Sequence, residues 1–226
     1  MTVFANTPQL NTGIYTYPDI ARLLGIPYAT AQRWLNQYWV GKLGQEYSRN
    51  YSWEVDNTKA VSFHTMMELR VFFELNQAGV KPAKILEAHK ELVGLSRSPF
   101  PFATKSILKG LRCDGKQVLL YRKKDGTVIS LNGTKQFNLG FVLDFMNKVD
   151  FQNDVVSQFW PLGKDNVVNC DPKRQFGHPV VGRTNIYPEL LASMHRAGDS
   201  IRSIAANYNL KAKEVKDSIA FSNKAA

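Results

Sequence analysis

The stretch of residues 17–35 constrains the fold of this chain most strongly, because its apolar pattern predicts two short helices separated by a tight turn. Ile20, Ala21 and Leu24 give the first of these helices an apolar face at helical spacing. Gly25 follows the last apolar position, where the end of a helix commonly needs a left-handed residue. The sequence therefore predicts one helix that ends at Gly25 and a second helix close behind it.

The limits and faces of these two helices carry further signals. Thr16, with Asp19 three residues later, predicts a capping box at the start of the first helix. Ala31, Trp34 and Leu35 form the expected inward stripe of the second helix. Such a stripe, with a tryptophan at its centre, indicates a small core between the two helices.

The opposite face of the second helix carries side chains that suit the reading of DNA bases. These residues are Tyr28, Ala29, Thr30, Gln32 and Arg33. Glutamine can read adenine, and arginine can read guanine, through two hydrogen bonds each. Two helices about a glycine turn are also the pattern by which many proteins enter the major groove. An ordinary helical hairpin is the alternative, and we favour the DNA-reading interpretation.

A small wing is expected after the second helix. Asp56-Asn57 is a turn signal between two strand-like runs, Trp53–Val55 and Ala60–Phe63. The candidate DNA contacts of this region are Arg49 and Lys59. Helical spacing then returns from Thr65 to Gly79, and again after Pro82.

Residues 13–95 together resemble a MerR-like winged-helix domain. The matching residues are Ile20–Ile26, Arg33, Trp34 and the later helix that ends at Ala78-Gly79. The resemblance implies a DNA-binding domain. Residues 1–60 carry five Lys or Arg against four Asp or Glu, so the domain needs dimerisation or another basic element to hold phosphates.

Length and composition favour a globular protein with an acidic partner. The 226 residues leave room for one large or two small domains, and 44% hydrophobic residues suffice for buried cores. The net charge of +10 favours nucleic acid or an acidic protein as partner. The sequence has no apolar run of the roughly 20 residues that a membrane helix needs. It also begins without a signal-peptide pattern, so we expect a cytoplasmic protein with no membrane partner.

Positive charge is concentrated in the middle of the chain. Residues 101–150 hold nine Lys or Arg against four Asp or Glu. Two strand-like runs, 117–121 and 127–131, flank a turn and predict a β-hairpin. The tip of this hairpin carries Arg122, Lys123 and Lys124. A solvated loop, a phosphate contact and a contact with an acidic patch on a partner are the three interpretations of this tip.

Two more features belong to the middle segment. Residues 141–149 predict a short helix whose Phe141, Leu143, Phe145 and Met146 are too apolar to be fully exposed. The proline-containing stretch 96–102 predicts a linker and a first domain boundary.

The C-terminal third predicts a second bundle of three helices. A strand-like run at residues 166–170 and another at 179–181 precede it. The expected inward residues are Leu190, Leu191 and Met194 on the first helix, Ile201, Ile204, Ala205 and Tyr208 on the second, and Val215, Ile219 and Ala220 or Phe221 on the third. Lys211 and Lys213, at the start of the third helix, are candidate phosphate or toxin contacts.

An ordered set of residues between 165 and 221 resembles a bacterial domain family that was long without a known function and is associated with VapB-type antitoxins. The matching residues are Val168–Pro172, Phe176-Gly177, Pro179–Val181, Thr184, Ile186, Ala197–Ile201, Ile204, Tyr208 and Leu210. Long members carry a MerR-like domain in front and are encoded beside a PIN-domain ribonuclease toxin. The resemblance implies an antitoxin with a VapC-like partner, whose active site is a cluster of carboxylates around a divalent metal.

No pattern of an enzyme or a metal site is present in the sequence. The four histidines, His64, His89, His178 and His195, have no metal-ligand spacing. Cys113 and Cys170 lie far apart without a CxxC motif, so we expect small buried side chains rather than a disulfide or a zinc site. We therefore expect no catalytic residues, no metal and no cofactor.

These signals predict a mainly α protein with small β elements, of the α+β class, in three parts. Residues 1–95 would form the winged helix–turn–helix, residues 96–164 a linker with the basic hairpin and a helix, and residues 165–226 the trihelical domain. We expect a DNA-binding antitoxin that inhibits a PIN-domain ribonuclease and represses its own operon as a homodimer or a toxin–antitoxin hetero-oligomer. A MerR-like regulator or a mobile-element DNA-binding protein without a toxin is the alternative.

Overall fold

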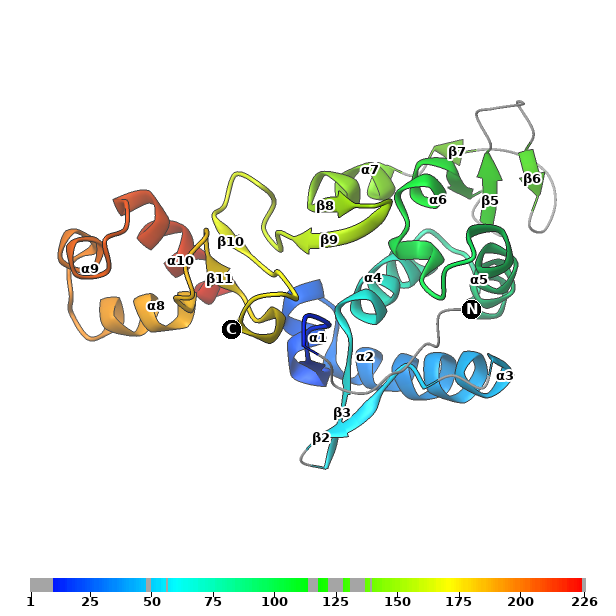
Figure 1. Cartoon of the computed structure of the whole chain (residues 1–226), viewed down its shortest axis with the longest axis horizontal. Coiled ribbons are helices and arrows are strands. Elements are labelled where there is room, and N and C mark those ends of the chain that lie inside the picture. Colours follow the sequence, from blue (N-terminus) through cyan, green and yellow to red (C-terminus); the bar gives the residue numbers. More distant parts are fainter. Residues whose placement is uncertain are drawn as a thin grey trace.

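The computed structural model shows a mainly helical protein with small antiparallel sheets, so the expected α+β class is confirmed (Figure 1). The structure describes residues 10–47, 50–55, 57–113, 118–121, 128–130, 137–138 and 140–224.

The N-terminal part contains two helices about a turn, followed by a small sheet. Its elements are β1 (Tyr15–Thr16), α1 (Tyr17–Leu24), α2 (Tyr28–Trp34), η1 (Leu35–Gly44), α3 (Gln45–Tyr47), β2 (Trp53–Val55) and β3 (Thr58–Val61). The three strands form an antiparallel sheet in the order β1-β3-β2. The second wing strand was expected at Ala60–Phe63 but runs from Thr58 to Val61. It ends before Ser62 because the Ser62 side chain caps the next helix.

The start and end of α1 follow the sequence signals. The backbone N–H and the hydroxyl of Thr16 donate to Asp19 Oδ2 over 2.9 and 2.6 Å, which confirms the capping box. Gly25 ends the helix in the left-handed conformation, with φ of 64°. Leu23 is buried on the inner face, whereas Ala21, expected there, is only partly buried.

The second helix is much longer than two turns, since α2 continues directly into η1 and α3. The η1 segment is a π-helix, in which each N–H bonds to the carbonyl five residues back. Leu35, Trp39 and Leu43 follow one another at a spacing of four and are fully buried. This spacing exceeds the 3.6 residues of an α-helical turn, so the wider helix keeps all three side chains against the core.

Four further elements complete the main helical core. They are α4 (Phe63–Gln77), α5 (Pro82–Ser96), η2 (Pro101–Ala103) and α6 (Lys105–Gly110). The Trp34 and Trp39 rings pack edge-on against Phe72 of α4, at centroid distances of 4.9 and 4.8 Å. The long second helix is therefore fixed to α4 by an aromatic cluster.

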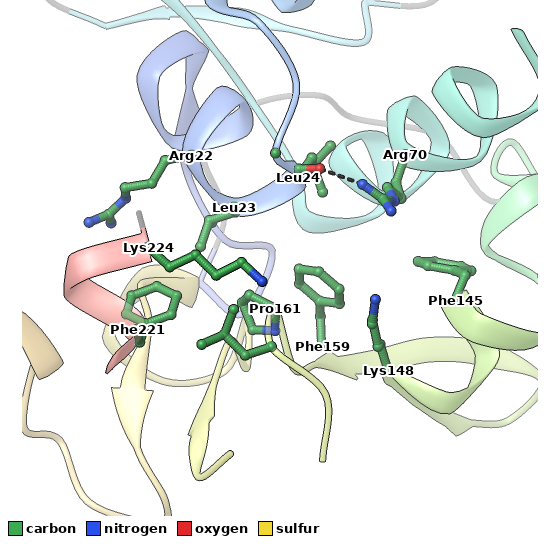
Figure 2. A pocket seen from close by; sticks show the side chains of 12 residues that line it. Arg22, Leu23, Leu24, Arg70, Phe145, Lys148, Phe159, Pro161, Phe221 and Lys224 are labelled. Atoms are coloured by element: carbon green, nitrogen blue, oxygen red, sulfur yellow. Dashed lines mark hydrogen bonds between the residues drawn. The ribbon is translucent and has the colours of Figure 1, made fainter. Parts of the chain in front are cut away.

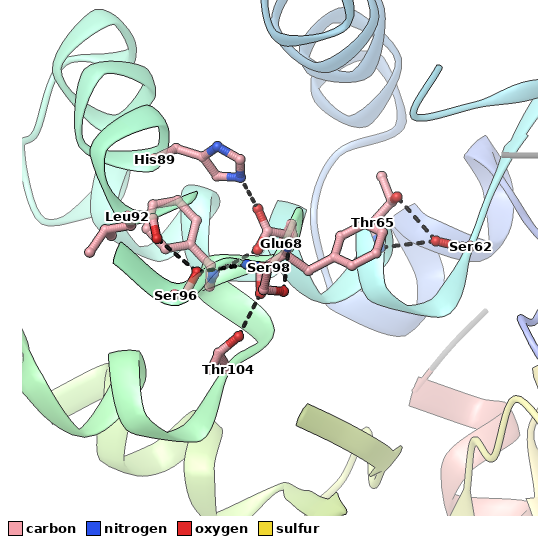
Figure 3. Close-up of polar contacts among 10 residues, drawn as sticks. Ser62, Thr65, Glu68, His89, Leu92, Ser96, Ser98 and Thr104 are labelled. Atoms are coloured by element: carbon pink, nitrogen blue, oxygen red, sulfur yellow. Dashed lines mark hydrogen bonds and ion pairs between the residues drawn. The ribbon is translucent and has the colours of Figure 1, made fainter. Parts of the chain in front are cut away.

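A buried ionisable pair, Glu68 and His89, joins α4 to α5 (Figure 3). Both side chains are fully buried, and the Glu68 Oε2 atom lies against Nε2 of His89. The other carboxylate oxygen, Oε1, accepts the backbone N–H of Phe102 at 2.6 Å. Phe102 itself is fully buried. The end of the stretch 96–102, expected to be a linker, is therefore packed into the core at Pro101 and Phe102, while the preceding residues are exposed or partly buried. The proposed limits of the three domains stay a prediction.

The middle segment adds a sheet, a helix and a second hairpin. Its elements are β4 (Leu111–Cys113), β5 (Val118–Tyr121), β6 (Val128–Ser130), β7 (Phe137–Asn138), α7 (Gly140–Asn147), β8 (Val149–Gln152) and β9 (Val155–Phe159). Strands β5 and β6 pair antiparallel, as expected of the two runs around the basic turn. Phe145 is buried as expected, but Leu143 is 63% exposed, and Val142, which was not among the expected residues, is buried instead.

The C-terminal third forms the expected three-helix bundle beside a two-stranded sheet. Its elements are β10 (Val168–Asn169), η3 (Gln175–Gly177), β11 (Val180–Val181), α8 (Pro188–Arg196), α9 (Ile201–Tyr208) and α10 (Ala212–Lys224). The bundle has a core of its own, made of Val181, Leu191, Ile204, Ala205 and Val215. Leu190, expected to face inward, is 42% exposed because the inner face of α8 is formed by Leu191 and Ala192. Figure 1 shows the bundle at one end of the molecule.

Several contacts attach this C-terminal part to the N-terminal part. Arg22 of α1 forms an ion pair with Glu189 of α8 at 2.5 Å. The Tyr15 hydroxyl donates to the Gly177 carbonyl at 2.8 Å, and Gly177 has φ of 83°. A Cβ atom at Gly177 would lie 2.1 Å from the tyrosine oxygen, so only glycine fits. Phe221 of α10 belongs to the main core rather than to the bundle core.

Replacement of Trp34 tests the core between α2 and α4. Trp34→Ala removes a ring that is 3% exposed, so we expect a loss of about 3–5 kcal/mol in the free energy of unfolding, measured by urea denaturation. Tyr28→Ala, on the exposed face of the same helix, is the matched control and should cost far less. Equal losses in the two variants would contradict the assigned faces of α2.

His64 at the start of α4 is a second point that stability measurements can test. Its Nε2 atom donates to the carbonyl of Val156 at 3.0 Å, and its ring stacks on Phe100. Burial lowers the pKa of the His64 imidazole from its ordinary value, while the hydrogen bond to Val156 acts in the opposite direction. The unfolded chain therefore binds a proton at a higher pH than the folded protein does.

This pKa shift gives the direction of a pH effect. Because the folded-state pKa is lowered, the folded protein should lose stability as the pH falls through the unfolded value of about 6.5. His64→Gln keeps a donor for Val156 without the titration, so its free energy of unfolding should fall less between neutral pH and pH 5. The exposed His195→Gln serves as control and should behave like the parent. A parental pH profile in His64→Gln would refute the assignment.

Candidate nucleic-acid interface

The face of α2 that was expected to read DNA is open to solvent. Tyr28 is 49% exposed, Ala29, Gln32 and Arg33 are exposed as well, and Thr30 is partly buried. Ala31 and Trp34, on the opposite side, are buried. The helix therefore has a polar outer face with one amide and one guanidinium, the two groups best suited to adenine and guanine.

Lys59 of the wing lies beside this face and is held there by a hydrogen bond. Its Nζ atom donates to Oδ1 of Asn36 at 2.8 Å, and the Tyr17 hydroxyl donates to the same oxygen at 3.1 Å. Asn36 lies one turn after Gln32 on the same helix. The three side chains thus connect α1, η1 and β3 at the base of the wing.

A groove lies between the exposed helix face and the wing. It is lined by Tyr17, Gln32, Asn36, Glu54, Asn57, Thr58 and Lys59. The edge of the Tyr17 ring meets the Tyr28 ring at a centroid distance of 6.0 Å, which extends the wall toward the start of α2. Glu54 brings an acidic group to the wing strand. The groove therefore offers polar hydrogen-bonding groups and little net charge.

Sequence reasoning missed Tyr17 and Asn36 as members of this surface. The position of Asn36 could have been found, because it follows Gln32 by four residues and so shares its helix face. The role of Tyr17 depends on the angle between α1 and η1, for which the sequence holds no signal. Arg49, the remaining candidate of this region, lies outside the described residues.

Among the other cationic candidates, Lys211 and Lys213 do not line this groove. Arg122, Lys123 and Lys124 lie outside the described residues. Lys213 donates to the Asp165 carbonyl at 2.7 Å and forms an ion pair with Asp217 at 2.5 Å, and Lys211 is exposed. The bundle that carries Lys211 and Lys213 lies at one end of the molecule, away from α2 and the wing (Figure 1). The structure thus brings Gln32 and Lys59 to one groove, with Tyr28 against its Tyr17 wall, and leaves the two bundle lysines apart. Arg33 is exposed on the same helix but does not line the groove.

The described ranges give no support for a metal site, a reactive thiol or a membrane-spanning helix. No group of three or more His, Cys, Asp or Glu side chains among them is arranged to hold a metal ion. Cys170 is buried, and burial raises the pKa of its thiol far above the ordinary value, so it is poorly suited to act as a nucleophile. In the same part of the chain, no helix has both the length and the apolar character that a bilayer crossing requires.

Comparisons with known proteins give relatives of the whole chain and of its C-terminal part. Residues 168–222, which include the bundle, match a family described as a protein of unknown function, DUF433. The uncharacterized protein Rv2308 of Mycobacterium tuberculosis is 25% identical over 231 residues, which cover 96% of this chain and 93% of that protein. The crystal structure of Rv2018 from the same organism has a TM-score of 0.65 at 16% identity, with 94% of this chain and 99% of that chain covered. The fold of this chain is therefore similar to a known experimental structure over nearly its whole length.

Proposed function

We propose that this protein is a DNA-binding antitoxin that represses its own operon and inhibits a ribonuclease. The observation that carries the DNA-binding half is the exposed face of α2, where Gln32 and Arg33 are both open to solvent and Gln32 lines the groove beside the wing. An exposed helix face of this composition, on a helix fixed by a buried aromatic cluster, suits insertion into the major groove.

A second copy of the chain would complete the DNA-binding unit. One α2 face offers few base-reading side chains, and residues 1–60 carry a net charge of only +1. Specific affinity commonly needs two recognition helices placed about one helical turn apart on the duplex. We therefore propose a homodimer on a palindromic operator.

The inhibition of a toxin rests on the resemblance of residues 165–221 to antitoxin-associated domains. A PIN-type active site is a cluster of carboxylates around a divalent metal, so a Lys or Arg placed there would neutralise the ligands and compete with the ion. The chain carries a net charge of +10, and its basic turn of Arg122, Lys123 and Lys124 is the segment best suited to this role.

Co-expression separates this proposal from its alternative. The chain would be produced with each open reading frame adjacent to its own gene, followed by affinity purification of the chain. Recovery of a stoichiometric complex with a ribonuclease, together with loss of the ribonuclease activity, is expected. A chain that binds DNA and captures no neighbouring product would instead support a MerR-like regulator without a toxin.

Replacement of Arg33 tests the reading of bases by α2. A preferred duplex would first be selected from a randomised library with the full chain. Arg33→Ala should then weaken binding to that duplex by about 1–3 kcal/mol in a gel-shift titration and relax the preference at one base pair.

The matched control is Arg202→Ala, which removes an exposed arginine from α9 in the bundle. Its affinity for the selected duplex should equal that of the parent. If both variants lose affinity equally, or if neither does, α2 is not the recognition helix.

The basic turn is tested by replacing Arg122, Lys123 and Lys124 together with alanine. We expect DNA binding to keep its dependence on salt concentration, while inhibition of the co-purified ribonuclease fails. A flatter salt dependence, by roughly one unit of slope per lost phosphate contact, would instead assign the turn to DNA. Unchanged binding and unchanged inhibition would leave the turn as a solvated loop and contradict its proposed role.

A further inference from the structure

A pocket of about 240 Å³ lies where the N-terminal, middle and C-terminal parts meet (Figure 2). The end of α1 and the turn at Gly25 form one wall, and Arg70 of α4 lies beside them. Residues of α7, of β9 and of the segment that follows β9 form the opposite wall, and Phe221 of α10 closes one side. The pocket is distinct from the groove between α2 and the wing.

The floor of this pocket is apolar. Leu23 and Leu24 come from α1, and Phe145, Phe159 and Phe221 come from three separate elements. Each of the five is at most 4% exposed, so they form a fixed surface of the main core. An apolar floor of this kind favours a ligand with an aromatic or branched aliphatic body.

Four cations stand around this floor, and the residues that line the pocket include no Asp or Glu. They are Arg22, Arg70, Lys148 and Lys224. Figure 2 shows Lys148 and Lys224 extending from different sides toward the space beside Phe159. Three of the four have a carboxylate partner outside the lining, so the positive charge left for a ligand is chiefly that of Lys224. This remaining charge favours an anion in the pocket.

The two arginines are oriented by other contacts, and the two lysines are freer to move. Arg22 pairs with Glu189, while Arg70 pairs with Glu74 and donates to the Leu24 carbonyl at the end of α1. Lys148 pairs with Asp144, an exposed carboxylate outside the pocket wall. Within the described part of the chain, Lys224 has no ion-pair partner. The lysines are therefore the groups most able to turn toward a ligand.

We propose that this pocket binds a small organic anion with an apolar body, of the arylcarboxylate class. The body would lie against the partly buried Pro161 and Leu162, above the phenylalanine floor, and the carboxylate would meet Lys148 and Lys224. The volume of about 240 Å³ is below the usual range of ligand pockets, about 300–1,000 Å³, so the ligand would be small, with one ring. This ligand site does not depend on the proposed binding of DNA or of a toxin. Its test therefore requires neither of them.

Isothermal titration of the full chain with matched probes tests both halves of this proposal. The probes are 3-phenylpropionate, its neutral amide, acetate and inorganic phosphate. Saturable binding of one 3-phenylpropionate per chain is expected, with each of the other three probes weaker by roughly tenfold or more, the loss expected for one charged hydrogen bond or for the buried ring. Equal binding of the acid and the amide, a preference for phosphate, or no saturable binding would overturn the proposal.

Two kinds of variant assign the binding to this pocket. Lys148→Met and Lys224→Met keep the aliphatic stem and remove the charge, so each should weaken 3-phenylpropionate by roughly tenfold. Leu162→Trp, in the wall, should abolish binding by filling the space without a change in charge. Far-ultraviolet circular dichroism and the melting temperature verify that each variant is folded.

Lys213→Met is the matched control. Lys213 also forms an ion pair with an aspartate four residues away, and it lies on α10 like Lys224, but it does not line the pocket. Its affinity for 3-phenylpropionate should equal that of the parent. A loss in this control as large as in Lys148→Met would show that net charge, rather than the pocket, attracts the anion.

Discussion

A carboxylate without access to water, that of Glu68, lies between α4, α5 and η2 and is hydrogen-bonded at each oxygen. A buried ionised group is unfavourable unless its polar atoms are paired, so its partners are fixed in place. His89 and the backbone N–H of Phe102 meet this need from segments that are 21 and 34 residues away in sequence. Loss of either partner would leave the carboxylate uncompensated, which makes the packing of these three segments interdependent.

The position of α2, the proposed recognition helix, depends on the same arrangement. Helix α4, which carries Glu68, also carries Phe72, against which Trp34 and Trp39 pack. Arg70, also on α4, pairs with Glu74 one turn further along the helix. Its guanidinium also donates to the carbonyl of Leu24, the last residue of α1. Both helices of the N-terminal motif are thus held by side chains of α4. The wing adds a third support where Lys59 meets Asn36.

The local features of the fold could be predicted from the sequence, whereas the long-range ones could not. The capping box at Thr16, the left-handed Gly25 and the strands of the wing are set by neighbouring residues, so short patterns indicate them. The stretch 96–102 looked like a linker because its two prolines break a helix, and the sequence holds no signal for the hydrogen bond between the Phe102 backbone N–H and the distant Glu68. The exposed groups of α2 were predictable from helical spacing, but Tyr17 enters the groove through the packing of α1 against η1.

Helix α10 belongs to two cores at once, since Val215 lies in the bundle core and Phe221 in the main core. Six residues separate them, and at about 100° per residue their side chains leave the helix in directions about 120° apart. Two different faces of the helix therefore pack into two different hydrophobic cores. A single residue inserted between the two positions would keep the helix intact, yet it would rotate Phe221 by about 100° about the helix axis relative to Val215. The length of this one segment is thus as constrained as its composition, although most of its surface faces solvent.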